Sequence, residues 1–392
     1  TLGRAKVFSG GSQNQNLCRV LNTYKNYGAL FLKPKILCIV GTRPEIIKMA
    51  PVIRSLQAVS ALDVQVLSSG QHRELLRPLI EWFELTIDID LNVMSHGQSL
   101  AELTGRLMPE LERTFKAQRP ALVIAQGDTT TVLCAALTCF YLNIPFAHVE
   151  AGLRTFDIRN PFPEEFNRTT VGKIAQLHFC PTAEARDHLL AERVDASTAY
   201  VTGNTVIDAL RFTEARLPSK SPHSDQQQIL LTAHRRENFG QPLIDICSAV
   251  LDICKEHPHL RFLCPVHPNP NVCEVLEQHL GNHPQITLSP PLGYPELVAA
   301  MQQSAFILTD SGGIQEEAAA LCRPVLILRE VTERPEIVEL GVAQIVGTAR
   351  ESIVSQARRL LLDKTHYAQM ARGALPYGNG DAAEKIRDIV CK

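Results

Sequence analysis

The sequence has 392 residues, of which 45% are hydrophobic and 20% are charged, as expected for a globular protein with large buried cores. Its formal net charge of −2 gives no basic surface for nucleic acid, and no run reaches the ~18 consecutive apolar residues that a membrane span requires. Single cores rarely grow beyond about 250–300 residues, so the length predicts two domains.

The first 34 residues differ in composition from the rest of the chain. They carry five basic residues and no acidic one, and they are rich in Gly, Ser, Asn and Gln without sustained periodicity. Of the 39 basic and 41 acidic residues in total, 34 and 41 remain, which gives the rest of the chain a net charge of −7. We therefore predict that residues 1–34 are an extension outside the fold.

Eleven cysteines are spread from Cys18 to Cys391, and none forms a Cys-x-x-Cys pair. This spacing argues against a structural metal site or a redox motif. Several cysteines lie in apolar runs, as Cys38 does, which is typical of buried free thiols. Free thiols persist in a reducing compartment, so a cytoplasmic protein is predicted.

From residue 35 onward, short apolar runs alternate with helix-length amphipathic segments such as 98–117 and 131–142. This alternation predicts parallel sheets with helices on both faces, and hence an α/β protein with two doubly wound, Rossmann-like domains. The predicted strands are 36–40, 64–67, 122–125, 146–149, 177–180 and 200–202 in the first domain, and 229–232, 262–266, 286–288, 306–309, 325–328 and 344–346 in the second.

The alternation of predicted strands and helices is interrupted once, around residues 213–227, where Pro, Ser, His and three consecutive Gln residues occur. We place an interdomain linker there and expect a cleft between the domains, because ligands bind outside the carboxyl ends of the strands in such sheets. A C-terminal helix, with 381–391 as its helical part, is expected to pack back on the N-terminal domain. The predicted boundaries are 35–212 for the N-terminal domain, 213–227 for the linker, 228–376 for the C-terminal domain and 377–392 for the C-terminal helix.

The first predicted strand runs directly into the turn Gly41-Thr-Arg-Pro-Glu, and Lys48 follows one turn later. Pro44 suits the first turn of a helix. Backbone amides at a helix N-terminus, together with Arg43 and Lys48, favour an anion. The alternative is a surface turn with solvated charges.

A second strand-to-helix turn follows the predicted strand 306–309, in the sequence Thr-Asp-Ser-Gly-Gly. Ser311, Gly312 and Gly313 offer a hydroxyl and unobstructed amides, which suit a diphosphate. Glu317 lies one helical turn further on the same face, where it can accept hydrogen bonds from ribose hydroxyls. The segment is neither a Walker A loop nor a dinucleotide fingerprint; a capped helix is the alternative.

Three loops at strand ends carry acids: Asp128 in Gln-Gly-Asp-Thr-Thr, Glu150 in His-Val-Glu-Ala-Gly, and Glu164 in Pro-Glu-Glu-Phe-Asn-Arg168. Three such loops on one sheet would point their carboxylates into one cleft. Crowded carboxylates with an arginine nearby are suited to proton transfer, because neighbouring charges separate their pKa values. Each acid taken alone is also typical of a helix cap.

His234 stands at the end of the first strand of the second domain, in Thr-Ala-His-Arg-Arg-Glu-Asn. A lone histidine is usually structural. Followed by Arg235 and Arg236 at a strand end, it is predicted to face the acids across the cleft and to contact a diphosphate or donate a proton.

Eight segments of the sequence together resemble the non-hydrolysing UDP-N-acetylglucosamine 2-epimerases of bacteria, and they stand in that family's order over about residues 35–380. The resemblance implies the two-domain fold of B-type glycosyltransferases, a homodimer, and no metal or nicotinamide cofactor. The segments are GTRPEIIKMAP, GDTTT, HVEAGLRT, PFPEEFNR, TGNTVIDAL, TAHRREN, DSGGIQEEA and TERPE.

The resemblance also implies a reaction: reversible conversion of UDP-N-acetylglucosamine to UDP-N-acetylmannosamine, through elimination of UDP and a 2-acetamidoglucal intermediate. The product would supply N-acetylmannosamine units for bacterial surface polysaccharide. By position, the family's catalytic residues fall on Asp128, Glu150, Glu164 and His234, with Arg168 close by. The positions that hold its UDP moiety are Arg43, Lys48, Ser311, Gly312, Gly313, Glu317 and Arg334.

One part of the family pattern is altered. Many bacterial members are activated by a second substrate molecule, at a regulatory site that includes a Gln-His-Arg-Gln segment. Here Gln71, His72 and Arg73 are followed by Glu74, and Gly97 stands where Arg is common. Losing a cation and gaining an acid should weaken binding of an anionic activator, so allosteric activation is expected to be weak.

Three other functions fit parts of the pattern. A hydrolysing UDP-N-acetylglucosamine 2-epimerase would release UDP and free N-acetylmannosamine, but that enzyme is often fused to a sugar kinase domain for which no sequence remains here. A retaining glycosyltransferase would not need three acidic loops. A nucleotide-sugar binding protein with an inactive site would not need Asp128, Glu150, Glu164 and His234 together.

Overall fold

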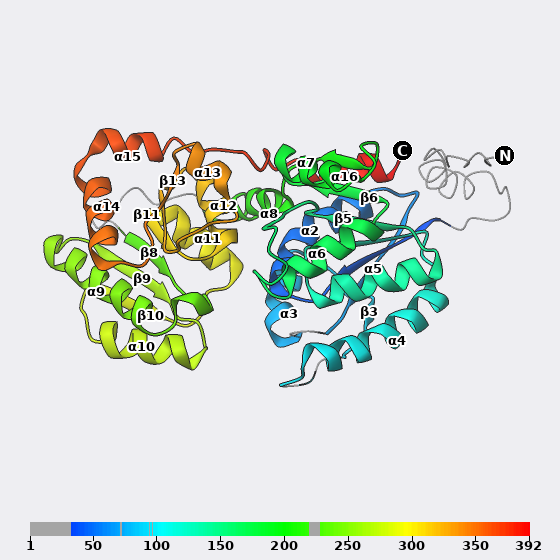
Figure 1. Cartoon of the computed structure of the whole chain (residues 1–392), viewed down its shortest axis with the longest axis horizontal. Helices are drawn as coiled ribbons and strands as arrows, with labels where there is room; N and C mark the ends of the chain where they lie inside the picture. The colour runs from blue at the N-terminus through cyan, green and yellow to red at the C-terminus, as the bar shows by residue number, and fades with distance from the viewer. Residues whose placement is uncertain (1–32, 71–72, 94, 96, 219–227) are drawn as a thin grey trace, which may run out of the picture. The chain divides into compact units, whose positions relative to one another are not determined.

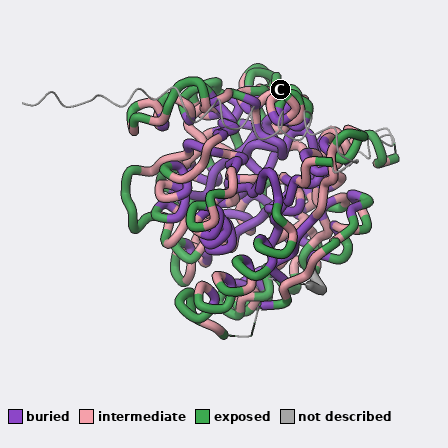
Figure 2. Tube along the Cα trace, turned by 90° about the vertical axis from the view of Figure 1, so that its right-hand side faces the viewer, coloured by how far each residue is buried: buried purple, intermediate pink, exposed green. Residues whose placement is uncertain are grey.

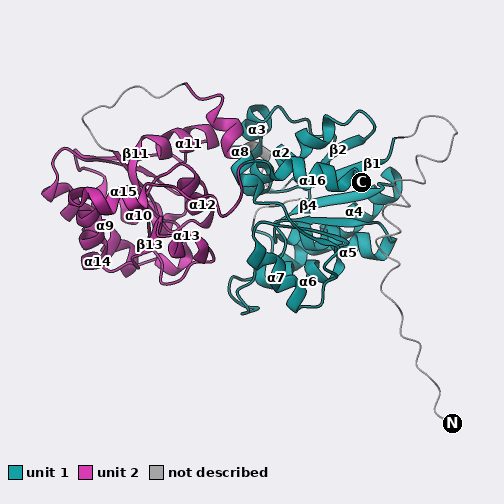
Figure 3. Cartoon of the chain, turned by 90° about the horizontal axis from the view of Figure 1, so that it is seen from above, with its two compact units in different colours: residues 1–209, 380–392 teal, residues 210–379 magenta. Residues whose placement is uncertain are grey.

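The computed structural model describes residues 33–70, 73–93, 95, 97–218 and 228–392. The chain divides into two compact units (Figure 3). The first combines the chain up to Ala209 with Gly380–Lys392, and the second is Leu210–Asn379. Most of the predicted extension, residues 1–32, and most of the predicted linker, residues 219–227, lie outside the described residues.

The first unit contains a seven-stranded parallel sheet, coloured from blue to green in Figure 1. Its strand order is β3-β2-β1-β4-β5-β6-β7. The chain order reverses between β1 and β4, which pair directly. The strands are β1 (Lys35–Val40), β2 (Asp63–Ser68), β3 (Ile89–Asp90), β4 (Leu122–Gln126), β5 (Phe146–Val149), β6 (Leu177–Cys180) and β7 (Ala199–Val201).

Helices pack on both faces of this sheet. Side chains alternate between the faces of a strand, so Leu37 and Ile39 of β1 share one core with Leu107 and Leu111 of α4, while Ile36 lies on the opposite face. The helices are α2 (Arg43–Gln57), α3 (Arg73–Trp82), α4 (Leu100–Gln118), α5 (Thr130–Leu142), α6 (Glu164–Ile174), α7 (Ala183–Ala191), α8 (Thr205–Glu214) and α16 (Ala382–Val390). The part of α8 from Leu210 onward belongs to the second unit.

The helix α16 returns to the first unit from the far end of the chain and packs against α2. Its first turn is held by Asp208 of α8: Ala383 N donates to Oδ1 at 2.8 Å and Ala382 N to Oδ2 at 3.3 Å. Burial raises the pKa of Asp208 to about 6. The division between the units falls inside α8, a few residues before the predicted boundary at 212.

The second unit contains a six-stranded parallel sheet in the order β10-β9-β8-β11-β12-β13. The strands are β8 (Gln228–Thr232), β9 (Arg261–Pro265), β10 (Ile286–Ser289), β11 (Ser304–Thr309), β12 (Val325–Ile327) and β13 (Ala343–Ile345). The helices are η1 (Arg236–Asn238), α9 (Gln241–Glu256), α10 (Pro270–Leu280), α11 (Tyr294–Gln303), α12 (Gly312–Ala320), α13 (Pro335–Glu339), α14 (Arg350–Leu362) and α15 (Lys364–Met370).

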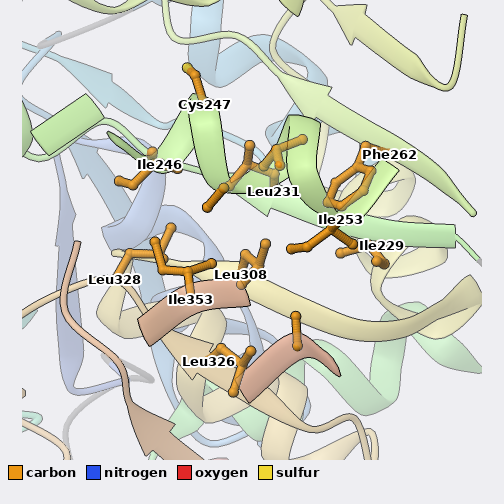
Figure 4. Packing of buried hydrophobic residues seen from close by; sticks show 14 of the residues in the cluster. Ile229, Leu231, Ile246, Cys247, Ile253, Phe262, Leu308, Leu326, Leu328 and Ile353 are labelled. Atoms are coloured by element: carbon orange, nitrogen blue, oxygen red, sulfur yellow. The ribbon is translucent and has the colours of Figure 1, made fainter. Parts of the chain in front are cut away.

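The core of the second unit lies between the sheet and the helices α9 and α14. Leu231 and Leu308, from the central strands, pack with Ile246 and Ile353 from those helices (Figure 4). Most residues of the strands are buried, and in Figure 2 the buried stretches of the chain lie in the interior with exposed stretches around the outside.

The expected fold class is confirmed, and every predicted strand is present with ends displaced by at most two residues. The structure adds β3, a two-residue strand that the sequence pattern does not predict. In each sheet the chain order reverses at one point, beside β1 and β4 and beside β8 and β11. Ligands of doubly wound sheets bind at this point, so it is the place to look for function.

Of the ten cysteines in the described residues, all are free and seven are buried, as predicted for a thiol-rich core. Burial raises the pKa of the Cys38 thiol to about 12, which makes it unreactive. In the same described part of the chain, no helix is both long enough and apolar enough to cross a membrane.

Candidate active site

The turn after β1 is closed by its own glutamate. Gly41 N and Thr42 N both donate to Glu45 Oε2 at 2.6 Å, and Thr129 Oγ1 donates to Glu45 Oε1 at 2.6 Å. Two of the amides that we expected to face an anion are therefore occupied by Glu45. The same carboxylate joins the turn that carries Arg43 to the loop that carries Asp128, across the point where the chain order reverses.

Glu150 follows β5 and is surrounded by donors from three other elements. Lys48 Nζ of α2 lies 2.5 Å from Oε1, Asn204 Nδ2 donates to Oε1 at 2.9 Å, and Gln126 Nε2 donates to Oε2. The backbone of Glu150 has φ 63°, a left-handed conformation that costs energy in a residue other than glycine and recurs at functional sites. Lys48, predicted to bind substrate, contacts one of the predicted catalytic residues.

Asp128 lies in the loop after β4, with its side chain 30% exposed. Its Oδ2 is 3.7 Å from Arg168 Nη1 of α6. Burial, assisted by the charges of Glu150 and Glu164 and opposed by those of Arg168 and Lys48, raises the pKa of Asp128 to about 6. A carboxyl with this pKa exchanges its proton near neutral pH, as acid–base catalysis requires.

Glu164 begins α6, and its Oε2 is buried without a hydrogen-bond partner in the described residues. The next residue, Glu165, has a different role. Its Oε1 accepts hydrogen bonds from Thr155 N and Phe156 N, each at 3.1 Å, and its Oε2 lies 2.9 Å from Arg168 Nε. Glu165 thus holds the loop before α6 and orients Arg168 toward Asp128.

These contacts bring five of the predicted residues together at one end of the first sheet. They come from α2, the loops after β4 and β5, and α6. The five are Lys48, Asp128, Glu150, Glu164 and Arg168, which we call the acid cluster. Carboxylates, a lysine and an arginine whose charges act on one another can transfer a proton and compensate the charge that the transfer creates.

Two buried histidines support this cluster from below. His148 of β5 and His178 of β6 are paired in register and are each 1% exposed. His148 Nε2 lies 2.7 Å from the carbonyl oxygen of Gly127. A carbonyl only accepts, so Nε2 carries the proton, and the neutral ring fixes the residue that precedes Asp128. Burial lowers the pKa of His148 to about 4 and that of His178 to about 3.

The two histidines predict acid lability. Between about pH 6.5, the ordinary histidine pKa, and pH 4, the unfolded chain binds protons that the folded chain does not. As the pH is lowered, the free energy of unfolding is therefore unaffected above about pH 6.5 and decreases below it, by several kcal/mol for the two histidines together. Urea unfolding from pH 7 to pH 4 should show this fall, and His178→Leu should make it shallower, whereas His259→Gln, at an exposed position, should leave it unchanged. Equal pH dependence in all three proteins would contradict the assignment.

In the second unit, Asp310 organises the end of β8. This fully buried carboxylate accepts hydrogen bonds at its Oδ2 from His234 N and Arg235 N at 2.8 Å and from Asn238 Nδ2 at 3.0 Å. Its Oδ1 lies 3.4 Å from His234 Nδ1. Burial lowers the pKa of His234, and the charge of Asp310 opposes this. The ring is stacked on that of His267, with centroids 5.6 Å apart.

The turn after β11 leads into α12 as predicted. Ser311 N donates to Thr309 Oγ1 at 3.0 Å, and a side chain added at Gly313 would meet nothing within 4 Å. The N-terminus of α12 is therefore open for an anion. Glu317 is buried one turn further along, where its Oε1 accepts a hydrogen bond from Tyr294 OH at 2.7 Å.

The remaining predicted residues stand at the starts of helices or lie outside the described part of the chain. Arg334 precedes α13 and pairs with Glu316 of α12, and Arg43 begins α2. Of the predicted regulatory residues, Gln71 and His72 lie outside the described residues, and Arg73 begins α3.

Sequence reasoning overlooked the residues that hold the candidates in place. A weak signal existed for most of them, because they stand within one or two residues of the motifs and have side chains that hydrogen-bond when buried. Tyr294 had no such signal. The overlooked residues are Glu45, Gln126, Glu165, Asn204, Asn238, Tyr294 and Asp310.

Two Rossmann-like units, one with an acid cluster and one with an open helix N-terminus beside the Asp310–His234 pair, define a nucleotide-sugar enzyme with the fold of B-type glycosyltransferases. The similarity to a solved glycosyltransferase, SnogD from Streptomyces nogalater, agrees with the fold, with a TM-score of 0.58 at 15% identity over 92% of this chain and 100% of that one.

The chain belongs to the UDP-N-acetylglucosamine 2-epimerase family, whose sequence model matches residues 54–391. The UDP-N-acetylglucosamine 2-epimerase of Escherichia coli K12 is 43% identical over 368 residues, which cover 91% of this chain and 98% of that protein. The crystal structure of UDP-GlcNAc 2-epimerase from Neisseria meningitidis bound to UDP-GlcNAc is similar with a TM-score of 0.87 and 40% identity, over 91% of this chain and 99% of that one. The family expected from the sequence motifs is therefore confirmed.

Proposed function

We propose that this chain interconverts UDP-N-acetylglucosamine and UDP-N-acetylmannosamine without hydrolysis. The observation that carries the proposal is the acid cluster, in which Asp128, with a pKa near 6, lies among the charges of Glu150, Glu164, Lys48 and Arg168. The Neisseria meningitidis relative was crystallised with UDP-GlcNAc, which supports the choice of substrate.

The chemistry explains why several carboxylates are needed. Carbon 2 of the sugar has no adjacent carbonyl, so removing its proton alone is unfavourable. Instead, a carboxylate takes the C2 proton, the bond between C1 and the UDP oxygen breaks with its electron pair, and a C1–C2 double bond forms in 2-acetamidoglucal. Addition of UDP to C1, with a proton delivered to the opposite face of C2, inverts that carbon.

We assign these roles to the acid cluster. Glu150, beside the Lys48 ammonium, is favoured in the ionised form and acts as a base toward C2. Asp128, with its pKa of about 6, can carry the proton for the opposite face. Glu164 shares the proton transfer, and Arg168 balances the charge of Asp128.

We assign the UDP moiety to the second unit. Ser311, Gly312 and Gly313 would bind the diphosphate at the N-terminus of α12, and His234 would donate to it. Such groups stabilise a leaving diphosphate by hydrogen bonds that are already in place. Arg334 is assigned to the same anion, and Arg43 is assigned to substrate binding by its place in the family pattern.

Glu317 is expected to hold the ribose, so changing it should affect nucleotide affinity more than chemistry. Glu317→Gln should weaken UDP binding about tenfold, the value of one charge-assisted hydrogen bond of roughly 1.4 kcal/mol. Isothermal titration with UDP measures this, and Ser311→Ala should act in the same direction. Glu296→Gln, on a neighbouring helix, serves as the control. An unchanged UDP affinity in both site variants would remove the second unit's turn from the nucleotide site.

Proton NMR of UDP-N-acetylglucosamine incubated with the protein in D₂O tests the proposal. Formation of UDP-N-acetylmannosamine with deuterium at C2 supports it. Free N-acetylmannosamine and UDP would identify a hydrolysing epimerase, and an unchanged spectrum would identify a binding protein; either result overturns the proposal.

We further propose that the chain acts as a homodimer in the cytoplasm, that its product enters bacterial surface polysaccharide, and that Glu74 and Gly97 weaken activation by a second substrate molecule. The support is the sequence pattern and the family membership. Light scattering of the purified protein tests the dimer. A sigmoidal dependence of rate on UDP-N-acetylglucosamine would contradict the weakened activation.

A further inference from the structure

Asn204 lies between β7 and α8 and is 2% exposed. Its Oδ1 accepts a hydrogen bond from Val206 N at 3.1 Å, and its Nδ2 donates to Glu150 Oε1 at 2.9 Å. The first bond fixes the orientation of the amide, because a backbone N–H needs the oxygen. The nitrogen must then face Glu150.

Glu150 has two further polar neighbours on its carboxylate. Gln126 Nε2 donates to Oε2, and Lys48 Nζ lies 2.5 Å from Oε1. The three groups come from the end of β4, from α2 and from the start of α8, so they approach the carboxylate from three elements. They hold the carboxylate of a residue whose backbone is itself in the left-handed region, an uncommon conformation outside glycine that recurs at functional sites.

We propose that Asn204 and Gln126 are positioning residues for the epimerase reaction: their side-chain amides fix the Glu150 carboxylate in place and in its ionised form. This inference rests on the proposed role of Glu150 as a base. By itself, the Lys48 ammonium compensates the charge of Glu150 without fixing the position of the carboxylate, since an ammonium on a flexible side chain can follow a carboxylate that moves. Two buried planar amides anchored by other elements cannot follow it.

The alternative is that Asn204 only caps α8. The two roles separate in Asn204→Asp. Aspartate keeps an oxygen for Val206 N and is as good a cap as asparagine, but it removes the donor to Glu150 and places a second carboxylate there. Gln126→Met removes the other donor without adding charge. Gln126 ends the strand β4 and caps no helix. An effect on catalysis that both variants share therefore cannot come from the loss of a helix cap.

We expect Asn204→Asp to lower kcat for UDP-N-acetylglucosamine about 10- to 100-fold, the range that a displaced catalytic group produces, with KM changed less than about threefold. Its urea midpoint should fall as the pH rises, because the two neighbouring carboxylates then repel each other in the folded protein. The acid limb of the kcat/KM profile should move to higher pH, because a neighbouring carboxylate opposes ionisation of the base. Gln126→Met should lower kcat with a smaller movement of that limb.

A cap without a catalytic role provides the control. Asp363→Ala removes the cap of α15 and should reduce stability while leaving kcat and the pH profile unchanged. Wild-type kcat and pH profile in Asn204→Asp would overturn the inference. A wild-type protein that converts no substrate would instead overturn the proposed function, so the two failures are distinguishable.

Discussion

Glu150→Gln is expected to reduce turnover of UDP-N-acetylglucosamine by about 100- to 10,000-fold, the contribution of a positioned general base or acid. The substitution keeps the shape of the side chain and removes its charge. It leaves the Lys48 ammonium, 2.5 Å from Oε1 in the native protein, without the carboxylate that compensates it. Deuterium incorporation at C2 from D₂O should fall by the same factor, because the proton transfer itself is lost.

The control for this prediction is Glu84→Gln, which removes a carboxylate from an exposed ion pair with Arg54 in the same unit. Exposed pairs contribute little, so turnover and exchange should remain at the native level. UDP affinity should be preserved in both variants, since the nucleotide is assigned to the second unit. If Glu150→Gln exchanges deuterium at the native rate, Glu150 is not on the proton path.

Asp310→Asn is expected to lower turnover by about 100-fold or more while changing stability little. The amide oxygen can still accept from His234 N, Arg235 N and Asn238 Nδ2, which the native Oδ2 holds. Its nitrogen then faces His234 Nδ1, and the negative charge that favours a protonated imidazole is lost. His234 is then a weaker donor to the departing diphosphate, and removing one such donor costs about 100-fold or more in turnover.

The pH dependence supplies a second readout. The charge of Asp310 opposes the lowering of the His234 pKa by burial, so removing it should lower that pKa further. NMR titration of the His234 ring should show this, and Asp252→Asn, in an exposed ion pair with Arg350, should not. Native turnover in Asp310→Asn would show that the charge of Asp310, and the protonation of His234 that it favours, have no part in the reaction.

The strands could be predicted closely because local patterns define them. The strand β5 is an apolar run between Pro145 and Glu150, and its predicted and observed ends agree. The strand β3 escaped prediction because two residues, Ile89 and Asp90, carry no periodicity. It forms only because β2 is already there to pair with.

The candidate site could be predicted less fully. The acids follow strands, and the strands of a parallel sheet end at one edge, so the grouping of Asp128 and Glu150 follows from topology. The role of Lys48 does not follow from topology, because its partner Glu150 is 102 residues away in the sequence. The positioning roles of Asn204 and Asp310 could not be predicted from the sequence either, because each residue acts through a contact with a segment that is distant in the sequence.

The return of α16 to the first unit reverses the order in which the two units can be completed during synthesis. A nascent chain folds from its N-terminus as it leaves the ribosome. The second unit is continuous and is whole once Asn379 has emerged, but the first still lacks the helix that packs on α2 and is capped by Asp208. The unit that is encoded first is therefore the one that is finished last, after residues 380–392 have been translated.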